Sequence, residues 1–311
     1  MDGLLLVMTV LSAVGSATVV YAVVALLKTI YHYGVYKFSF RSYGGEWAVV
    51  TGASGGIGAE FCRRLAARGV NIILLARSVD KMKQLAQECE SKYSVETVVH
   101  GFDFGAAEEE QWATLKQVVM SKSATILINN VGISFEMPTD FIDVDEQLIE
   151  RMMLVNIRST NRMTKMVLPH MVSSKKGIIM CLSSGGGAVT PAPMLSPYAG
   201  TKAYNDAFAV SLNGELRPHG VHVHSLTPFF VEGSMAKMRR SFTVPTAERF
   251  VENALSQVAS SPRLNPYWVH YMMGTAVRAL PLQQQTERVA TLHSSIRKRA
   301  LRKQERLAKR T

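Results

Sequence analysis

The stretch of sequence that decides the fold is Thr51-Gly52-Ala53-Ser54-Gly55-Gly56-Ile57-Gly58 (TGASGGIG). It follows a short apolar run, residues 46–51, and leads into a helical pattern over residues 56–68. Glycine suits such a turn because the backbone needs unusual φ angles and because a Cβ would block the close approach of a pyrophosphate. The N-terminus of the helix adds free N–H groups and a partial positive charge. The stretch therefore predicts a phosphate-binding turn between a strand and a helix.

Outward from this turn, short apolar runs alternate with segments of helical pattern. Such alternation indicates a parallel sheet covered on both faces, a doubly wound, Rossmann-type α/β fold. No repeat or linker composition interrupts residues 46–262, so we expect a single domain there. The expected strands are residues 46–51, 71–76, 95–102, 124–129, 177–182 and 221–227. The expected helices after the first are residues 79–91, 106–120, 145–171 and 196–216.

The N-terminal segment has the composition of a membrane span. Residues 3–27 carry no charge, and as a helix they would measure about 37 Å against a hydrocarbon core of about 30 Å. A secretory signal is the alternative, but Asp2 stands where a basic region is usual and the apolar run is too long for one. Positive charge follows at Lys28, so the positive-inside rule places the N-terminus in the lumen and the remainder in the cytosol.

Composition and charge exclude several classes of protein. Apolar residues make up 47% of the 311 residues and charged residues 19%, which excludes disordered and collagen-like chains. Of the net charge of +11, the tail over residues 295–311 carries +7, so the body gives no reason to expect a nucleic-acid partner. The tail is interpreted as a solvated helix or as a ligand for anionic lipid headgroups. Three scattered cysteines predict neither a disulfide framework nor a metal site.

Further motifs follow the glycine-rich turn in chain order. Each is weak alone, since Tyr33 and Lys37 form a second Tyr-x-x-x-Lys beside the membrane segment. Order and placement on the expected elements make the set specific. With the T-G-x-x-x-G-x-G spacing, it resembles the short-chain dehydrogenase/reductase family. The motifs are Asn129-Asn130-Val131-Gly132 after the fourth strand, Asn156 in the next helix, Ser183-Ser184 after the fifth strand, and Tyr198-x-x-x-Lys202 at the start of the following helix.

Tyr198 and Lys202 carry the clearest chemistry. Residues i and i+4 share one face of a helix, so we expect the ammonium to lower the pKa of the phenol from its ordinary value of about 10. A general acid/base near neutral pH results. The resemblance implies that NADPH supplies a hydride to a ketone, that Tyr198 supplies the proton and that Ser184 polarises the carbonyl. It also implies that Lys202 and Asn156 form a relay to water and that Lys202 grips the ribose.

The position of the serine departs from the family pattern. The family places it about 13 residues before the tyrosine, which here is Gly185, whereas Ser184 and Ser183 lie 14 and 15 residues before Tyr198. A one-residue insertion over residues 185–197 would reconcile them. We therefore expect Ser184 to be the polarising serine and Ser183 to be a local turn or cap residue.

The end of the second strand indicates the cofactor. NAD-binding relatives present an acidic side chain there, but Ala76 is followed by Arg77, whose cation suits a 2′-phosphate, so NADPH is favoured over NADH. Asp103 matches the family's adenine-contacting acid, with a helix cap as the alternative. The resemblance implies a cofactor site made of Gly52, Ser54, Gly56, Ile57, Gly58, Arg77, Asp103, Asn130, Tyr198, Lys202 and Val231.

The residues after the sixth strand indicate which branch of the family the chain resembles. Most relatives have Pro-Gly there, whereas this chain has Pro228-Phe229-Phe230-Val231. With the anchor and the basic tail, this resembles the membrane-bound very-long-chain 3-oxoacyl-CoA reductases and their hydroxysteroid dehydrogenase relatives. The resemblance implies reduction of a long-chain 3-oxoacyl-CoA at the endoplasmic reticulum, beside the other enzymes of fatty-acid elongation. A steroid or other lipid-ketone dehydrogenase, and a non-catalytic cofactor-binding membrane scaffold, are the alternatives.

The segment over residues 266–281 is apolar but interrupted. His270 and Arg278 make it too polar and too short to span a bilayer, so it is interpreted as an interfacial helix, as a lid over the substrate cleft, or as a core helix without membrane contact. The tail is placed to meet CoA phosphates or lipid headgroups, and the resemblance leaves room for a homodimer. The expected parts are an anchor (1–28), a linker (29–45), an NADP-binding reductase domain (46–262), a lid or interfacial segment (263–294) and a basic tail (295–311).

Overall fold

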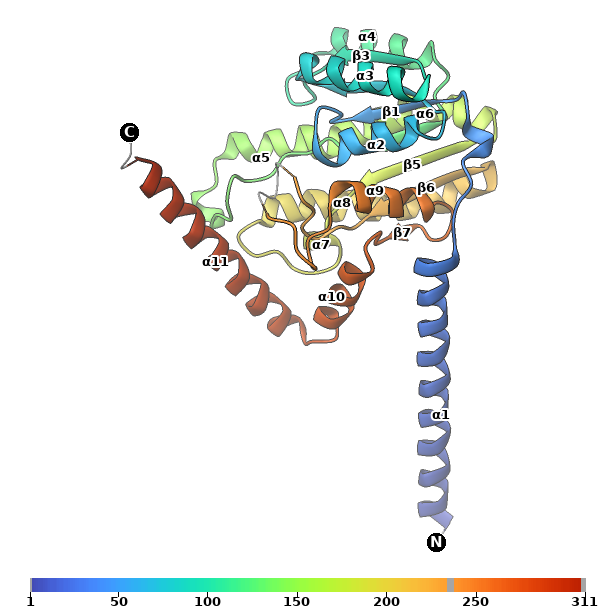
Figure 1. Cartoon of the computed structure of the whole chain (residues 1–311). Coiled ribbons are helices and arrows are strands. Elements are labelled where there is room, and N and C mark those ends of the chain that lie inside the picture. The colour runs from blue at the N-terminus through green and yellow to red at the C-terminus, as the bar shows by residue number, and fades with distance from the viewer. Residues whose placement is uncertain (1, 234–237, 309–311) are drawn as a thin grey trace.

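A computed structural model of the chain describes residues 2–233 and 238–308. At its centre lies one sheet of parallel strands in the order β3-β2-β1-β4-β5-β6-β7 (Figure 1). The apolar runs form strands because helices cover both faces of the sheet, and every residue of β5 is buried. The predicted doubly wound α/β fold is confirmed. The strands are β1 (Trp47–Thr51), β2 (Asn71–Ala76), β3 (Thr97–Gly101), β4 (Ile126–Asn129), β5 (Gly177–Leu182), β6 (Val221–Leu226) and β7 (Arg263–Leu264).

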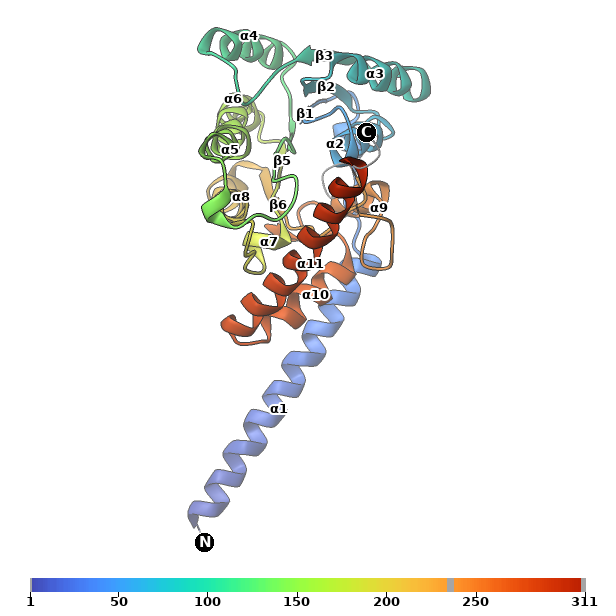
Figure 2. The ribbon, with the colours of Figure 1, turned by 90° about the vertical axis from the view of Figure 1, so that its left-hand side faces the viewer.

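Two layers of helices enclose the sheet. One layer holds α2, α3 and α9, and the other holds α4, α5, α6 and α8 (Figure 2). Each layer buries its own apolar cluster against one face of the sheet, with Phe61 and Phe250 in the first and Trp112 in the second. The helices are α2 (Gly56–Ala66), α3 (Val79–Tyr93), α4 (Glu109–Met120), α5 (Glu146–Met152), α6 (Ser159–Ser173), α7 (Gly185–Ala188), α8 (Ser196–Leu216) and α9 (Ala247–Ser256).

The strand order brings the predicted motifs to one edge of the sheet. Chain order reverses at β1, which pairs with β2 on one side and with β4 on the other. The loops after β1 and β4 therefore lie side by side at the carboxyl edge, and the loop after β5 lies next to them. Ligands of open α/β sheets bind at this switch point.

The structure differs from the sequence-based expectation in several elements, among them helices α7 and α9, which were not expected. The helix expected over residues 145–171 is interrupted by a π-helical segment, η4 (Met153–Arg158), and such segments are frequent at functional sites. Strand β7 lies just beyond the expected end of the domain at residue 262. Two residues are too few to produce an apolar pattern, so β7 is visible only through its pairing with β6.

The N-terminal helix α1 (Asp2–Ile30) projects away from the domain (Figure 1). Residues 3–35 are long and apolar enough to cross a membrane. The segment expected as a linker is docked on the domain. It contains the π-helical turn η1 (Tyr31–Val35) and the 3-10 turn η2 (Arg41–Tyr43), the Tyr36 hydroxyl donates to the Val258 carbonyl (2.7 Å), and Phe40 is buried. The direction of α1 is thus tied to the domain.

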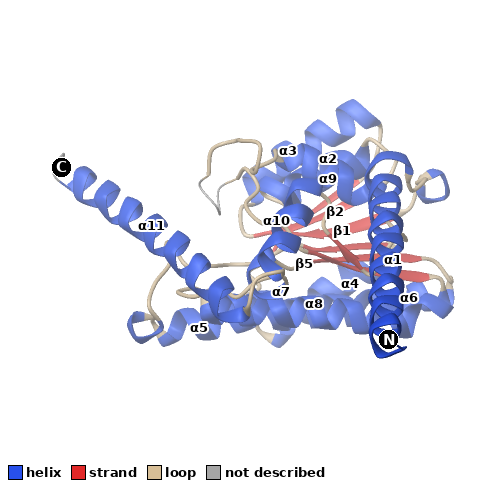
Figure 3. Cartoon of the chain, turned by 90° about the horizontal axis from the view of Figure 1, so that it is seen from below, coloured by secondary structure: helices blue, strands red, loops and turns tan. Residues whose placement is uncertain are grey.

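Two further helices complete the chain. Figure 3 shows α10 (Trp268–Arg278) beneath the domain and α11 (Leu282–Ala308) extending away from it. Helix α11 is held near its middle, where His293 Nδ1 lies 2.6 Å from the Pro193 carbonyl oxygen and Arg297 pairs with Asp140 at 2.5 Å. Residues 301–308 are exposed and belong to α11, so the basic segment up to residue 308 continues a helix rather than forming a separate tail.

Candidate active site

The glycine-rich turn has the geometry that its sequence predicts. Gly52 and Gly56 have φ angles of +67° and +56°, which residues with a Cβ rarely adopt. Gly58 serves a different purpose, because a Cβ there would lie 2.3 Å from the Gly52 carbonyl oxygen. Helix α2 can therefore pack close to the end of β1 only with glycine at position 58.

The turn faces open space. A Cβ at Gly55 or Gly56 would meet no protein atom within 4 Å, and the first N–H groups of α2 have no partners within the helix. Ser54 and Ile57 are half-buried beside this space, and Ile57 packs against the core. Open room at a helix N-terminus fits a pyrophosphate, so the residues present fit a nicotinamide dinucleotide.

Asn130 supports the turn from behind. Its Nδ2 donates to the carbonyl oxygens of Thr51 (2.9 Å) and Gly52 (3.2 Å). The Thr51 hydroxyl accepts from the backbone N–H groups of Asn130 (2.9 Å) and Val131 (3.0 Å) and donates to the Ile128 carbonyl (3.1 Å). Thr51 was not among the predicted site residues, although it is the first residue of the quoted motif.

Arg77 and Asp103 lie close together at the ends of β2 and β3. Their side chains approach to 3.9 Å (Nη1 to Oδ2), and 63% of the Arg77 side chain is exposed. Arg151 on α5 is a second cation beside the same carboxylate, with Nη2 3.5 Å from Oδ2. Asp103 Oδ1 accepts from the Gly105 N–H at 2.9 Å. The sequence analysis missed Arg151, because 48 positions separate it from Asp103 and only the fold brings them together.

Lys202 is fixed beneath the tyrosine on α8. Its Nζ donates to the Leu182 carbonyl at 2.7 Å and lies 5.8 Å from the centre of the Tyr198 ring. Burial of the ammonium lowers the pKa of Lys202 to about 8. The charge of this lysine therefore changes within a range that an enzyme assay covers.

Tyr198 differs electrostatically from the expectation. Burial raises the pKa of Tyr198, and a side-chain hydrogen bond with Ser184 only partly offsets that rise. The predicted lowering by Lys202 is therefore wrong for the protein without a bound cofactor. The reason is that the Leu182 carbonyl binds the ammonium, while desolvation acts on the phenolate. Tyr198 accordingly retains its proton at neutral pH.

The two adjacent serines have different surroundings. Ser183 is buried, and its hydroxyl donates to the Lys202 carbonyl at 2.6 Å. The Ser184 hydroxyl accepts from the Gly186 N–H at 3.2 Å, and it acts on the Tyr198 phenol in the direction that lowers the pKa of Tyr198. Ser183 thus ties α8 to β5, whereas Ser184 lies beside the phenol.

Asn156 lies in the π-helical segment η4 and is fully buried. Its Oδ1 accepts from the Ile133 N–H (2.8 Å), and its Nδ2 donates to the Ile133 carbonyl (3.0 Å) and to the Thr201 hydroxyl (2.9 Å). A Cβ at Gly132 would lie 3.3 Å from Lys202 Nζ and 3.4 Å from Asn156 Oδ1. The side chain of Asn156 therefore joins the loop after β4 to α8 beside the lysine.

The residues after β6 connect this site to α10. Phe229 lies against Gly185, where a Cβ would come within 2.5 Å of its ring, and its N–H donates to His270 Nδ1 at 3.3 Å. The Val231 side chain is buried in the apolar cluster on the α2 face. Only the backbone of Val231 is therefore placed to meet a cofactor, and Phe229 occupies room that smaller residues at 185 and 274 leave open.

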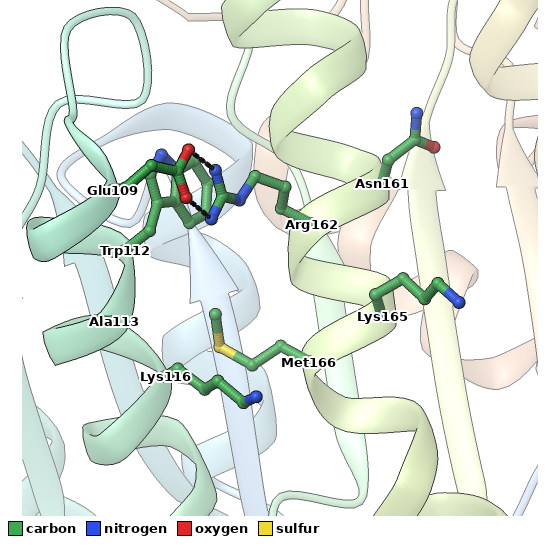
Figure 4. A pocket seen from close by; sticks show the side chains of 8 residues that line it. All are labelled: Glu109, Trp112, Ala113, Lys116, Asn161, Arg162, Lys165 and Met166. Carbon is green, nitrogen blue, oxygen red and sulfur yellow. Dashed lines mark hydrogen bonds and ion pairs between the residues drawn. The ribbon is translucent and has the colours of Figure 1, made fainter.

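A surface hollow of about 420 Å³ lies away from these residues, between α4 and α6 (Figure 4). Its wall includes the ion pair of Glu109 with Arg162, whose guanidinium lies 4.4 Å from the centre of the Trp112 ring. None of the predicted site residues lines it. Within residues 2–233 and 238–308, no group of three or more His, Cys, Asp and Glu side chains is placed to hold a metal ion.

Comparison with known proteins agrees with this arrangement. Residues 46–243, which include the glycine-rich turn and the Tyr198–Lys202 pair, match the family model described as short chain dehydrogenase. The chain is similar to the human very-long-chain 3-oxoacyl-CoA reductase, with 38% identity over 262 residues that cover 83% of each chain.

Two solved structures extend the comparison. A short-chain dehydrogenase from Sphingobium yanoikuyae in complex with NADPH has a TM-score of 0.62 and 27% identity, covering 68% of this chain and 83% of that one. A 7beta-hydroxysteroid dehydrogenase has a TM-score of 0.72 over 81% of this chain and 100% of that one. Its identity is only 19%, so this second likeness shows the fold alone.

Proposed function

The chain belongs to the short-chain dehydrogenase family, and we propose that it is an NADPH-dependent reductase that converts long-chain 3-oxoacyl-CoA to 3-hydroxyacyl-CoA in fatty-acid elongation. The substrate class rests on the similarity to the human very-long-chain 3-oxoacyl-CoA reductase, which covers most of both chains. The reaction rests on one observation, the buried ammonium of Lys202 5.8 Å from the centre of the Tyr198 ring, with the Ser184 side chain acting on the same phenol to lower its pKa.

In the proposed reaction, NADPH supplies the hydride that reduces the ketone carbon. Tyr198 holds its proton at neutral pH because burial raises its pKa, and it donates that proton to the carbonyl oxygen. The Ser184 hydroxyl donates a hydrogen bond to the same oxygen as negative charge develops there. Lys202 would hydrogen-bond the ribose. Together with Asn156 it would relay a proton from water to the phenolate, which restores the phenol. Each turnover thus adds one hydride and one proton to the ketone.

The choice of NADPH over NADH rests on Arg77. Its guanidinium stands at the end of β2, largely exposed, and its nearest acidic partner, Asp103, is 3.9 Å away. An exposed cation at this edge can pair with a 2′-phosphate, whereas an acidic residue there would repel it. Asp103 is proposed to contact the adenine, with Arg151 and the Gly105 N–H holding its carboxylate in place.

We propose that α1 anchors the protein in the endoplasmic reticulum membrane, with the N-terminus in the lumen and the catalytic domain in the cytosol. The support is the length and apolar composition of α1 and the cations that follow it, beginning at Lys28. Membrane lipids, the neighbouring elongation enzymes and a second copy of the chain are the partners that this proposal implies. Crosslinking of the full chain in membranes tests the last two.

The test is oxidation of NADPH by the full chain reconstituted in liposomes. The substrates are 3-oxoacyl-CoAs of increasing length and a panel of ketosteroids, with Tyr198→Phe measured alongside. Oxidation that increases with acyl length and is abolished in the variant supports the proposal. Preference for steroids favours a hydroxysteroid dehydrogenase. If the wild type oxidises NADPH with none of these substrates, the result favours a cofactor-binding membrane scaffold.

A further inference from the structure

Helix α10 exposes an apolar side that the described protein does not cover. Four large side chains on this helix, here called the α10 face, are exposed to 42% (Trp268), 40% (Tyr271), 54% (Met272) and 37% (Met273). The opposite side of α10 is buried on the domain. A helix with one buried side and one uncovered apolar side needs a partner for the second side, since large exposed apolar patches mark interaction surfaces.

The α10 face continues the apolar surface of α1. Tyr33, in the turn directly after α1, donates from its hydroxyl to the Asn265 carbonyl at 2.7 Å. The Tyr33 ring also lies 6.0 Å from the Tyr271 ring, centre to centre. Figures 1 and 2 both show α10 and the start of α11 on the side of the domain from which α1 projects. A bilayer that contains α1 therefore lies on the side of the domain that presents α10 and the start of α11.

The charges around α10 suit a lipid surface. Residues 253–286 include no aspartate or glutamate, and of their two cations Arg263 is paired with the Asp206 carboxylate, which leaves Arg278 nearest to α10. The Arg278 guanidinium donates to the carbonyl oxygens of Val189 (3.0 Å) and Ala188 (2.9 Å), so this cation stays at the domain rather than on the apolar side. Trp and Tyr on an otherwise uncharged helix side are typical of the membrane interface.

We infer that the α10 face lies in the interfacial region of a phospholipid bilayer, as a second membrane contact beside α1. The inference rests on the proposed membrane anchoring of the chain by α1. Trp268 meets the Phe242 ring on one edge (5.7 Å between centres) but stays 42% exposed, and Met272 stays 54% exposed. A lid in water would leave this area uncovered, whereas acyl chains at the depth of the headgroups cover it.

The inner side of α10 connects this contact with the reacting groups. His270 Nδ1 accepts from the Phe229 N–H, and a Cβ at Gly274 would lie 3.6 Å from the Phe229 ring. Phe229 in turn lies against Gly185, the residue after Ser184. Phe229 thus lies in contact both with the inner side of α10 and with the residue that follows Ser184. The substrate chain that this position favours is one dissolved in the membrane, with its polar head in the cytosol.

Trp268 supplies a native probe of the inference. The chain has three tryptophans; Trp112 is buried, and the ring of Trp47 is covered by the Lys122 ammonium at 4.4 Å. The full chain is reconstituted in phosphatidylcholine vesicles with and without brominated acyl chains, which quench tryptophan by contact. We expect quenching in the wild type and in Trp47→Phe, and its loss in Trp268→Phe. Equal quenching in Trp268→Phe and the wild type, or none in either, would overturn the inference.

A second pair of variants separates membrane contact from catalysis. Met272→Glu places a charge on the α10 face, whereas Met272→Leu preserves its apolar character. We expect Met272→Glu to reduce the quenching of Trp268 at least two-fold and to raise the KM for a long-chain 3-oxoacyl-CoA about ten-fold, with the KM for a short, water-soluble 3-oxoacyl-CoA unchanged. Quenching is read without turnover, so a wild type that is quenched but inactive refutes the proposed reaction and retains the membrane contact. A wild type that is active but not quenched supports the proposed reaction and refutes the membrane contact of α10.

Discussion

The chain contains Tyr-x-x-x-Lys twice, and the two copies have different surroundings. Tyr198 and Lys202 lie on one face of α8, with the ammonium bound to the Leu182 carbonyl under the phenol ring. Tyr33 lies in the π-helical turn after α1, and Lys37 lies beyond that turn in extended chain, exposed to solvent. The Tyr33 hydroxyl donates a hydrogen bond to the Asn265 carbonyl.

The difference shows what converts a sequence motif into a site. Four residues of separation bring two side chains together only where the helix continues through both. Reactivity further requires neighbours from other strands, and at Tyr198 these come from the ends of β4 and β5. Near Tyr33 the contacts are structural: a hydrogen bond to the Asn265 carbonyl and ring contacts with His32 and Tyr271. The following predictions test this contrast, from the largest expected effect to the smallest.

Removing the hydroxyl of Tyr198 is expected to have the largest effect. Tyr198→Phe should lower kcat at least about 10³-fold, because proton donation by a positioned group contributes about 10²–10⁴ to the rate. NADPH binding, measured by fluorescence titration, should change less than about three-fold. Reductase activity within ten-fold of the wild type would show that another group supplies the proton.

Replacing the ammonium of Lys202 is expected to cause the second largest loss of activity. Lys202→Met is expected to lower kcat/KM about 10²-fold, since the charge that orients the ribose and relays the proton is lost. In the wild type, kcat/KM should fall as the pH rises above about 8, because Lys202 then loses its proton. A wild-type profile that is flat from pH 7 to 9.5 would contradict this assignment.

The same lysine predicts a pH dependence of stability. Its pKa is lowered from 10.5 to about 8, so between these values the unfolded chain holds a proton that the native chain releases. The free energy of unfolding should therefore rise with pH across this window, and this rise should be absent in Lys202→Met. Thermal unfolding in detergent at pH 8, 9 and 10 measures it, and a fall in Tm common to both proteins would refute it.

Arg77 should produce an intermediate effect that depends on the cofactor. Arg77→Gln is expected to raise the KM for NADPH about 10–30-fold, because a charge-assisted hydrogen bond contributes about 1.5–3 kcal/mol and the exposure of Arg77 places it at the low end of that range. The KM for NADH should change less than two-fold. Arg151→Gln is the matched comparison, and its effect should be smaller because this arginine acts through Asp103. An equal rise in KM for NADPH and for NADH would show that Arg77 does not act through the 2′-phosphate.

The smallest effect is expected at the second copy of the motif. Tyr33→Phe should leave kcat and KM within two-fold of the wild type and lower the free energy of unfolding by about 1 kcal/mol, the contribution of one hydrogen bond. A loss of activity comparable to that of Tyr198→Phe would abolish the contrast between the two pairs.

Much of the site could be predicted because the chemistry at each motif is local. The glycines of the turn are required by φ angles and close packing, which depend on neighbours in the chain, and their positions agree with the expectation. Arg151 and the support of the turn by Thr51 could not be predicted, because their partners lie far away in sequence. The direction of the Tyr198 pKa shift was also predicted wrongly, since desolvation depends on everything that surrounds the phenol.

The sequence by itself determined the alternation of strands and helices, the glycine-rich turn and the apolar N-terminal helix, because period and local conformation are properties of neighbouring residues. Only the tertiary structure decided that Arg151 lies beside Asp103, that burial raises the pKa of Tyr198, and that the segment after α1 is docked on the domain. Those outcomes depend on contacts between distant elements, among them the packing of α8 against β5 and of η1 against residues near 258–265.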